Sequence, residues 1–295
     1  MNPVSRSWQE RLRPYLFILP AMIFLSVFVL YPVINMIYLS FTNWNLVSAT
    51  KKMVGFTNYS YLFRRKDFLD ALTNTFTYTI FTVMIQMTLS IFFAVWLKRA
   101  TRVNNFLRTA MFTPHIISLL SVAMVWVWLM DEKSGLLNMI LNMLGLQPLR
   151  WLQSSDTAMM SLIIVSCWKS VGYNTMIMYA ALQSIPSDIY EAAELDNAGK
   201  LSAFFKITFP MISPHAFLVL ITMTIGSFRV FETIRIMTNG GPGTSTQVLV
   251  YYIYQTAFSY FKVGLASTAG VVLLAIVSIM TATYFLALSK RVHYQ

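Results

Sequence analysis

The segment Ala71–Leu97, ALTNTFTYTIFTVMIQMTLSIFFAVWL, contains no Asp, Glu, Lys or Arg. A helix needs about 20 mostly apolar residues to cross the hydrocarbon core of a bilayer, and this segment is longer than that. Two basic residues, Lys98 and Arg99, follow it at once. Long cationic side chains at this position reach the lipid headgroups. The segment therefore predicts a membrane-spanning helix.

Five further segments have the same character, so the chain is predicted to be an all-α polytopic membrane protein with about six transmembrane helices. Three of the five carry no Asp, Glu, Lys or Arg, and the fourth span in chain order is interrupted only by Lys169. The five segments are Pro14–Phe41, Thr109–Met130, Thr157–Leu182, Ile207–Phe231 and Val263–Ser289.

The overall composition supports a protein dissolved in lipid. Hydrophobic residues make up 57% of the 295 residues, charged residues only 11%, and mean hydropathy is +0.60. Soluble domains carry about 25% charged residues. The net charge of +11 could suggest a nucleic-acid partner. The basic residues lie at the ends of the apolar runs, however, and no basic stripe with stacking aromatics is present, so we expect no nucleic acid.

Basic residues in the loops give the orientation. Lys98–Arg108 is a short loop with four Lys and Arg residues, and such loops stay in the cytoplasm. Both chain termini are therefore expected to be cytoplasmic in a multi-pass protein, although the long loop Thr42–Asp70 puts many basic residues on the outer side. Aromatic residues in that outer loop, including Trp44 and Tyr59, predict a folded or interfacial element.

The connection between the fourth and fifth spans reads QSIPSDIYEAAELDNAG over residues 183–199. Pro186 disfavours α geometry at the residue before it, so the fourth span is expected to end there. Ser187–Leu195 is predicted to form a short helix, and Asp188 with Glu191 resembles a capping box at its start. Residues 197–199 are predicted to form the turn that follows.

The short helix has a mostly small apolar face, formed by Ile189, Ala192, Ala193 and Leu195. Small side chains allow the backbone to approach another surface closely, and the acidic neighbours suit a basic partner. An ordinary surface loop is the alternative that these residues leave open.

These residues carry a resemblance to a known family. Glu191-Ala192-Ala193, then Asp196 and Ala198, resemble the EAA motif of the permease subunits of bacterial ABC importers. The flanks are similar to the binding-protein-dependent branch for sugars and glycerol phosphate. The similar flanking residues are Phe204, Ile207, Pro210, Trp168, Ala180–Pro186, Thr238–Gly243 and Arg291–Tyr294.

The resemblance implies the type I importer permease fold and a division of the chain into regions. Residues 1–70 would hold the N-terminal tail, first span and outer loop, and residues 71–289 the permease core. Residues 290–295 would form a cytoplasmic tail. The loop 183–206 would be a cytoplasmic coupling loop seated on an ATPase subunit. The residues implied in coupling are Glu191, Ala192, Ala193, Asp196, Asn197, Ala198 and Gly199.

One residue departs from the family pattern, because Asn197 stands where Gly is usual. We expect a left-handed backbone conformation at this position, and Asn adopts it more readily than other non-glycine residues. The turn should therefore survive the change.

The same resemblance implies partners that this chain lacks. No phosphate-binding G-x-x-x-x-G-K-[ST] sequence occurs, so ATP and Mg are expected in a separate ATPase subunit. We expect neither an enzyme activity nor a cofactor or metal ion in this chain itself. The expected partners are two ATPase subunits, an extracytoplasmic solute-binding protein, membrane lipid and a second permease, expected to be a different one.

Polar residues inside the fourth span are candidates for the substrate pathway. Lys169 lies about 20 Å and 25 Å from the two ends of that span, close to mid-membrane. A charge there costs at least about 2.5 kcal/mol, so it should face a cavity or a partner. Tyr173 follows at i+4 and Asn174 lies beside it. The substrate pathway and a structural pairing across a subunit interface both fit.

Two further groups lie near the outer end of the fifth span. Arg229 is expected to pair with Glu232 at i+3, and a role at an outer gate is the alternative. Gly240, Gly241 and Pro242 predict a sharp turn, which in the family faces the pathway entrance. In the sixth span, Ala266 and Gly270 form a small-xxx-small pair suited to tight helix packing.

The sequence therefore predicts a permease subunit in the bacterial inner membrane. With a second permease it would form the pathway for a carbohydrate delivered by a binding protein. Sugars, polyols and glycerol phosphates all fit. An ion-driven secondary transporter and a membrane-embedded enzyme are the rival classes, but neither internal inverted repeats nor a catalytic pair is visible.

Overall fold

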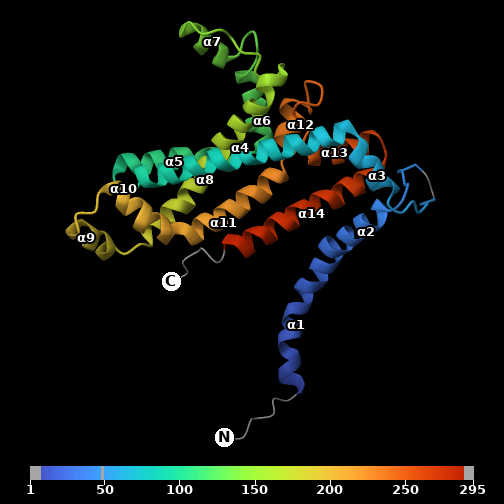
Figure 1. Cartoon of the computed structure of the whole chain (residues 1–295), viewed down its shortest axis with the longest axis horizontal. Coiled ribbons are helices and arrows are strands. Elements are labelled where there is room, and N and C mark those ends of the chain that lie inside the picture. The colour runs from blue at the N-terminus through green and yellow to red at the C-terminus, as the bar shows by residue number, and fades with distance from the viewer. Residues whose placement is uncertain (1–7, 48–49, 289–295) are drawn as a thin grey trace. The chain divides into compact units, whose positions relative to one another are not determined.

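The computed structural model describes residues 8–47 and 50–288. These residues are mostly helical, and the extended pairing among them is the isolated bridge between Thr42 and Met53 (Figure 1). The chain divides into two compact units. One contains Met1–Arg64 with Ile253–Val272, and the other contains Arg65–Tyr252 with Leu273–Gln295.

The first unit contains a long helix whose segment from Tyr15 to Leu30 is apolar at every position except Ser26. Helices α1 (Trp8–Leu25) and α2 (Tyr31–Ser40) join through a π-helical turn, Ser26–Leu30. Every side chain from Tyr15 to Leu30 is exposed, which is the expected character of a helix surrounded by lipid or by another membrane protein.

The start of α14 (Val263–Leu288) packs very closely on α2 within this unit. A Cβ added at Gly264 would come within 1.9 Å of the Thr42 carbonyl oxygen, and one at Gly270 within 2.7 Å of Met36 Sδ. The Thr268 hydroxyl donates to the Ser40 carbonyl oxygen at 3.1 Å. The tight packing predicted from the small residues of this span is confirmed.

The loop after α2 is folded, as predicted. It contains helix α3 (Thr57–Arg64), and the rings of Phe41, Phe56 and Tyr59 lie within 5.6 Å of one another. The Asn58 amide donates to the carbonyl oxygens of Ser40 and Thr42, both at 2.9 Å.

The second unit holds the other helices. In chain order these are α4 (Lys66–Trp96), α5 (Arg102–Ile116), α6 (Leu119–Leu129), α7 (Leu136–Met143), α8 (Ser155–Gln183), α9 (Ser187–Leu195), α10 (Lys200–Ala203), a π-helical turn (Phe204–Thr208), α11 (Phe209–Phe228), α12 (Glu232–Met237) and most of α13 (Leu249–Tyr254), followed by the rest of α14.

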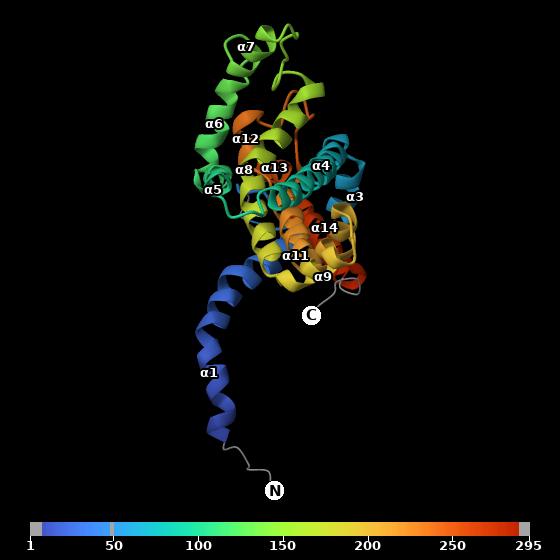
Figure 2. The same cartoon turned by 90° about the vertical axis from the view of Figure 1, so that its left-hand side faces the viewer.

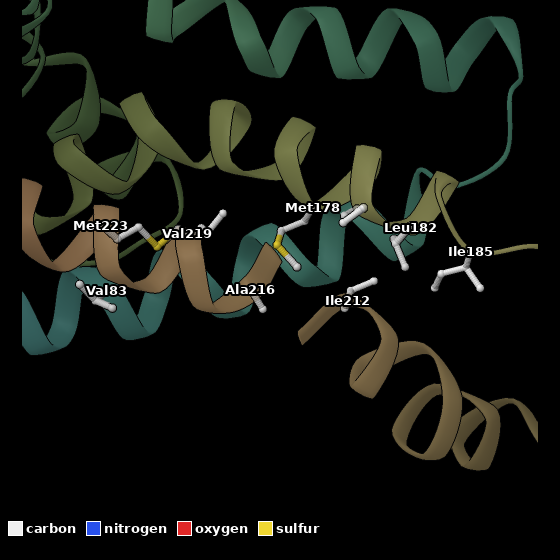
Figure 3. Close-up of a cluster of buried hydrophobic side chains, with 10 residues drawn as sticks. Val83, Met178, Leu182, Ile185, Ile212, Ala216, Val219 and Met223 are labelled. Atoms are coloured by element: carbon white, nitrogen blue, oxygen red, sulfur yellow. The ribbon is translucent and has the colours of Figure 1, made fainter. Parts of the chain in front are cut away.

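Helix α8 is the central element of this unit, because it contacts α4, α5, α11 and α12. It approaches α5 very closely at Gly172, where a Cβ would lie 1.7 Å from the Met111 carbonyl oxygen. A cluster of buried side chains from α4, α8 and α11 lies near the α9 end (Figure 3). Lipid removes the hydrophobic drive between spans, so such packing is what holds them together.

Most predicted spans are present. Four helices are apolar and long enough to cross a membrane by length and composition, namely Tyr15–Ser40, Lys66–Trp96, Lys200–Met237 and Val263–Leu286. Helix α8 matches the predicted fourth span in its bounds but is more polar, because much of its surface faces other helices and not lipid.

The continuous third span predicted at Thr109–Met130 is wrong. Helices α5 and α6 meet there at an angle of 101°, and the two residues between them, Ile117 and Ser118, have extended backbone. The apolar pattern runs across this break without a change. Pro114, which lacks an N–H, lies inside the last turn of α5 and weakens the helix there.

Candidate functional site

The loop after α8 folds as a short helix and a turn, at the bounds that the sequence predicts. Pro186 has φ −59° and ψ 142°, and α9 begins at the next residue. The predicted capping box is wrong, because Pro186 is the N-cap and makes no side-chain bond. The Asp188 carboxylate instead accepts the N–H of its neighbour Ile189 at 3.0 Å.

The end of α9 is closed by a Schellman motif. The Ala198 N–H donates to the Ala193 carbonyl oxygen at 2.9 Å, and the Asn197 N–H to the Glu194 carbonyl oxygen at 3.0 Å. Asn197 has φ 53°, so the left-handed conformation predicted for it is confirmed. Gly199 has φ −61°, and a Cβ on it would meet nothing within 4 Å.

The two sides of α9 differ sharply. Ala193 is 8% exposed, and Ile189 and Tyr190 pack on the cluster of Figure 3. Lys98 Nζ lies 3.7 Å from the centroid of the Tyr190 ring, a cation–π contact that ties this loop to the end of α4.

The outward side of the loop carries most of the residues implied in coupling. Ala193 is the exception, since it faces inward. The exposed residues are Glu191, Ala192, Asp196, Asn197, Ala198 and Gly199. Leu195 is 84% exposed. The predicted apolar face is therefore divided, with Ile189 and Ala193 facing the helices and Ala192 and Leu195 facing away.

A second candidate site is a polar cleft of about 310 Å³ farther along the same helices. It brings together all five polar residues singled out near mid-membrane and the outer end of the fifth span. These residues are Lys169, Tyr173, Asn174, Arg229 and Glu232. Side chains of α4, α5, α6, α8, α11 and α12 contribute to its lining.

Lys169 bonds to the break between α5 and α6. Its ammonium donates to the carbonyl oxygens of Ile117 at 2.7 Å, Pro114 at 3.2 Å and His115 at 3.4 Å. These are carbonyls that have lost their helical partners because α5 ends there. The charge is thus satisfied inside the chain, a pairing that sequence analysis did not foresee, while the side chain still lines the cleft.

Tyr173 belongs to an aromatic stack in the cleft. Its ring lies 4.3 Å from that of His115, with the planes 11° apart, and Phe112 lies at 6.5 Å. His115 also lines the cleft, and the sequence analysis did not single it out. The signal available was its position, directly after Pro114 and inside an apolar span.

Asn174 is more deeply placed than its neighbour, with 5% exposure. Its amide donates to Gln86 Oε1 at 3.3 Å, and the Gln86 amide donates to the Ser166 carbonyl oxygen at 3.2 Å. Tyr78 donates to the Ser166 hydroxyl. The contact between α4 and α8 is therefore a row of hydrogen bonds.

Arg229 and Glu232 do not form the predicted ion pair. Within the described ranges 8–47 and 50–288, no salt bridge joins them, and both side chains are exposed. The i+3 spacing counted on a continuous helix, whereas α11 ends at Phe228 and Phe231 has φ −141°.

The glycine-rich loop forms the predicted sharp turn. Gly240 has φ 83°, and a Cβ on it would lie 2.7 Å from Tyr251 Cε1. The Thr246 hydroxyl donates to the Gly241 carbonyl oxygen at 2.7 Å. The Asn74 amide of α4 donates to the Thr244 carbonyl oxygen at 2.7 Å. The loop is thereby fixed to α4, and Gly240, Gly241 and Pro242 are not among the residues that line the cleft.

Comparison with solved structures identifies the fold. The chain superposes on the alginate ABC transporter of bacteria in complex with an alginate pentasaccharide-bound periplasmic protein, with a TM-score of 0.86, 23% identity and 97% and 98% of the two chains covered. A second structure, a bacterial ABC transporter involved in the import of alginate, gives a TM-score of 0.82 at 25% identity and covers 96% and 99%.

Sequence relatives cover nearly all of the chain. A probable ABC transporter permease protein of Bacillus subtilis, YurN, is 37% identical over 94% of this chain and 97% of its own length. The sulfoquinovosyl glycerol permease SmoG of Agrobacterium fabrum is 32% identical, covering 93% and 90%. The sn-glycerol-3-phosphate permease UgpA of Escherichia coli is also 32% identical, covering 100% and 99%.

The family model described as "Binding-protein-dependent transport system inner membrane component" matches residues 53–294. With this match, the relatives and the shared fold, the chain belongs to that family, the transmembrane permease subunits of ABC importers.

Proposed function

We propose that this chain forms, with a second and different permease, the pathway for a carbohydrate that an extracytoplasmic binding protein delivers. The observation that carries this is the polar cleft, which combines an aromatic stack with amide, hydroxyl and charged groups. Rings of sugars pack on aromatic faces, while their hydroxyls need donors and acceptors placed around them. The named substrates of the relatives, sulfoquinovosyl glycerol and glycerol 3-phosphate, support this class of solute.

The energy comes from elsewhere in this proposal. The outward side of α9 seats on an ATPase subunit, and two such subunits use ATP and Mg to drive transport. This chain itself carries out no hydrolysis and holds no cofactor. The support is geometric, because Ile189 and Tyr190 fix the loop from within while Glu191, Ala192 and Asp196 remain exposed for a partner.

The orientation follows from the same loop. We place α9 and both chain termini in the cytoplasm of a bacterial cell, with the protein in the inner membrane. The basic loop Lys98–Arg108 agrees with this placement. Lys98 of that loop lies against Tyr190 of α9, so the two cytoplasmic features occupy the same end of the unit.

The experiment is purification of the tagged chain from native membranes in mild detergent, with mass spectrometry of the proteins recovered. We expect an ATPase with a phosphate-binding loop, a second permease and, in the presence of solute, a binding protein. Recovery of this chain alone, under conditions that keep other ABC complexes intact, would contradict the proposed assembly.

A further inference from the structure

Helix α7 exposes a stripe of large apolar side chains, and one of its two polar residues is turned inward. Its exposed side is a stripe with the i, i+3, i+4, i+7 spacing. The stripe consists of Leu136, Met139, Ile140 and Met143, which are 42%, 51%, 45% and 78% exposed. Beyond the helix, Leu144 and Leu146 continue it at 68% and 55%. The apolar side thus faces outward along the whole element.

The inward polar residue is Asn138, which is 3% exposed, whereas Asn142, on the side away from the stripe, is exposed. The Asn138 amide donates to the carbonyl oxygens of Glu132 at 3.0 Å and Leu149 at 2.9 Å. Its side-chain oxygen accepts the N–H of Leu149 at 3.0 Å and the indole N–H of Trp151 at 2.9 Å. Asn138 therefore makes four hydrogen bonds, and these fix the rotation of α7 about its axis.

Both ends of α7 are fixed as well. The Asp131 carboxylate accepts the Ser134 N–H and hydroxyl, each at 2.8 Å, and these bonds lower its pKa from the usual 3.8. A Cβ at Gly135 would lie 2.4 Å from the Asp131 carbonyl oxygen, so the start of α7 packs directly on the backbone that follows α6. The helix ends in a Schellman turn at Gly145, φ 72°. The exposed apolar stripe is therefore a built feature.

The stripe lies at the end of the unit opposite the coupling loop. Helix α8 separates the two, and its 29 residues span about 44 Å at 1.5 Å per residue. Figure 2 shows α7 and α9 at opposite ends. In the orientation proposed above, α7 therefore lies near the outer surface of the membrane.

We propose that α7 lies in the outer leaflet, with its apolar stripe against phospholipid acyl chains. Six large apolar side chains on one side are costly to leave in water. A soluble protein that binds and dissociates would need polar groups on this surface to set its orientation, and the stripe provides none. The exposed Lys133 flanks the stripe, where it suits phosphate headgroups, while Arg150 on the other flank forms an ion pair with Glu132 at 3.3 Å. The helix is thus an anchor in the plane of the membrane that holds the connection between α6 and α8 at a fixed depth.

The test measures the surroundings of the stripe directly. In a Cys167→Ala background, Met143→Cys is labelled with an environment-sensitive fluorophore. The intact complex is placed in nanodiscs of phosphatidylethanolamine and phosphatidylglycerol. Half of the samples contain lipid with a nitroxide near the headgroup end of the acyl chain, and the others receive aqueous iodide. Asn142→Cys, the neighbouring residue about 100° round the same helix, is the matched control.

We expect the nitroxide lipid to quench the label at residue 143 at least about threefold more than the label at 142, and iodide to show the opposite order. Met139→Cys should behave as residue 143 does, which guards against a local effect of one substitution. Quenching of 143 by iodide would place the stripe in water and overturn the proposal. Protection from both quenchers would assign the stripe to a protein partner and overturn it equally. Neither outcome depends on transport, so both are separate from a failure of the proposed function.

Discussion

Ala192 and Ala193 are neighbours with opposite surroundings, and this decides how the proposed coupling role of the α9 loop should be tested. Ala193 is the buried one, so a change there also disturbs the packing of the loop. For Ala192→Trp we expect an unchanged thermal midpoint and about tenfold less ATPase co-purified, equivalent to about 1.4 kcal/mol of binding. Leu218→Trp, which adds the same side chain to an exposed position of α11, is the control. Full recovery of the ATPase with Ala192→Trp would contradict the proposed contact.

The backbone of Asn197 allows a sharper substitution series. At φ 53°, Asn197→Gly should leave the loop unchanged, because glycine adopts this conformation without strain. Asn197→Val should cost about 1–2 kcal/mol. Limited proteolysis of the loop in the purified complex measures this, and equal cleavage rates for the Gly and Val variants would show that the left-handed turn is not required.

Lys169 makes a testable structural contribution as well as lining the cleft. Lys169→Met leaves the carbonyl oxygens of Pro114, His115 and Ile117 without this donor, and we expect a loss of about 1–3 kcal/mol. Thermal unfolding in detergent is the measurement, with Lys52→Met, an exposed lysine in a loop, as control. Restoration by Lys169→Arg would support the bonding role, and an unchanged midpoint for Lys169→Met would exclude it.

At the scale of single residues, predictions from the sequence hold where the backbone conformation depends only on neighbouring residues. The left-handed Asn197 and the glycine-rich turn follow from the residues alone. The Arg229–Glu232 pair fails because its spacing assumed a helix that ends at Phe228. The bonds of Lys169 could not be foreseen, since their acceptors are backbone atoms far away in the sequence.

At the scale of elements, α5 and α8 cross very closely at Gly172. A Cβ there would overlap the Met111 backbone, and backbone cannot move aside as a flexible side chain can. We expect Gly172→Ala to separate the helices and to lower both the thermal midpoint and the yield of assembled complex. Gly226→Ala, in α11, is the matched control, because its Cβ would meet nothing within 4 Å. Equal effects of the two substitutions would refute the close crossing.

Breaks between helices are the features that the hydrophobic pattern of the sequence does not predict. Hydrophobicity runs through Ile117 and Ser118 with no change in character, so a single span was predicted where α5 and α6 turn by 101°. Pro114 indicates that the helix is weakened near this break, but it does not predict the angle between α5 and α6. By contrast, the bounds of α9 were predicted to the residue, because Pro186 and the turn after Leu195 are both local signals.

At the scale of the whole molecule, the membrane class and the approximate spans could be read from apolar length alone. The cleft could not, since it draws residues from six helices that only the packing brings together. The polar character of α8 was visible in the sequence, yet its central place is a property of the packed unit.

A prediction at this scale concerns the two exposed charges of the cleft. If the cleft is the pathway, Arg229→Gln and Glu232→Gln should each lower solute uptake in the complete system about tenfold while leaving the ATPase attached. Substitution of Arg150, an exposed basic residue in a loop outside the cleft, should leave uptake within twofold. Normal uptake with both glutamine variants would remove the cleft from the pathway.

Helix α8 is one uninterrupted rod from Ser155 to Gln183, whereas the α5–α6 and α11–α12 walls of the cleft are jointed. Lys169 and Tyr173 lie on either side of Gly172, where α8 packs directly against the backbone of α5. Because α8 is continuous and packs on α5 at this point, we expect a displacement of its α9 end to tilt the part of the helix beyond Gly172. The breaks between α5 and α6 and between α11 and α12 would take up the change in angle.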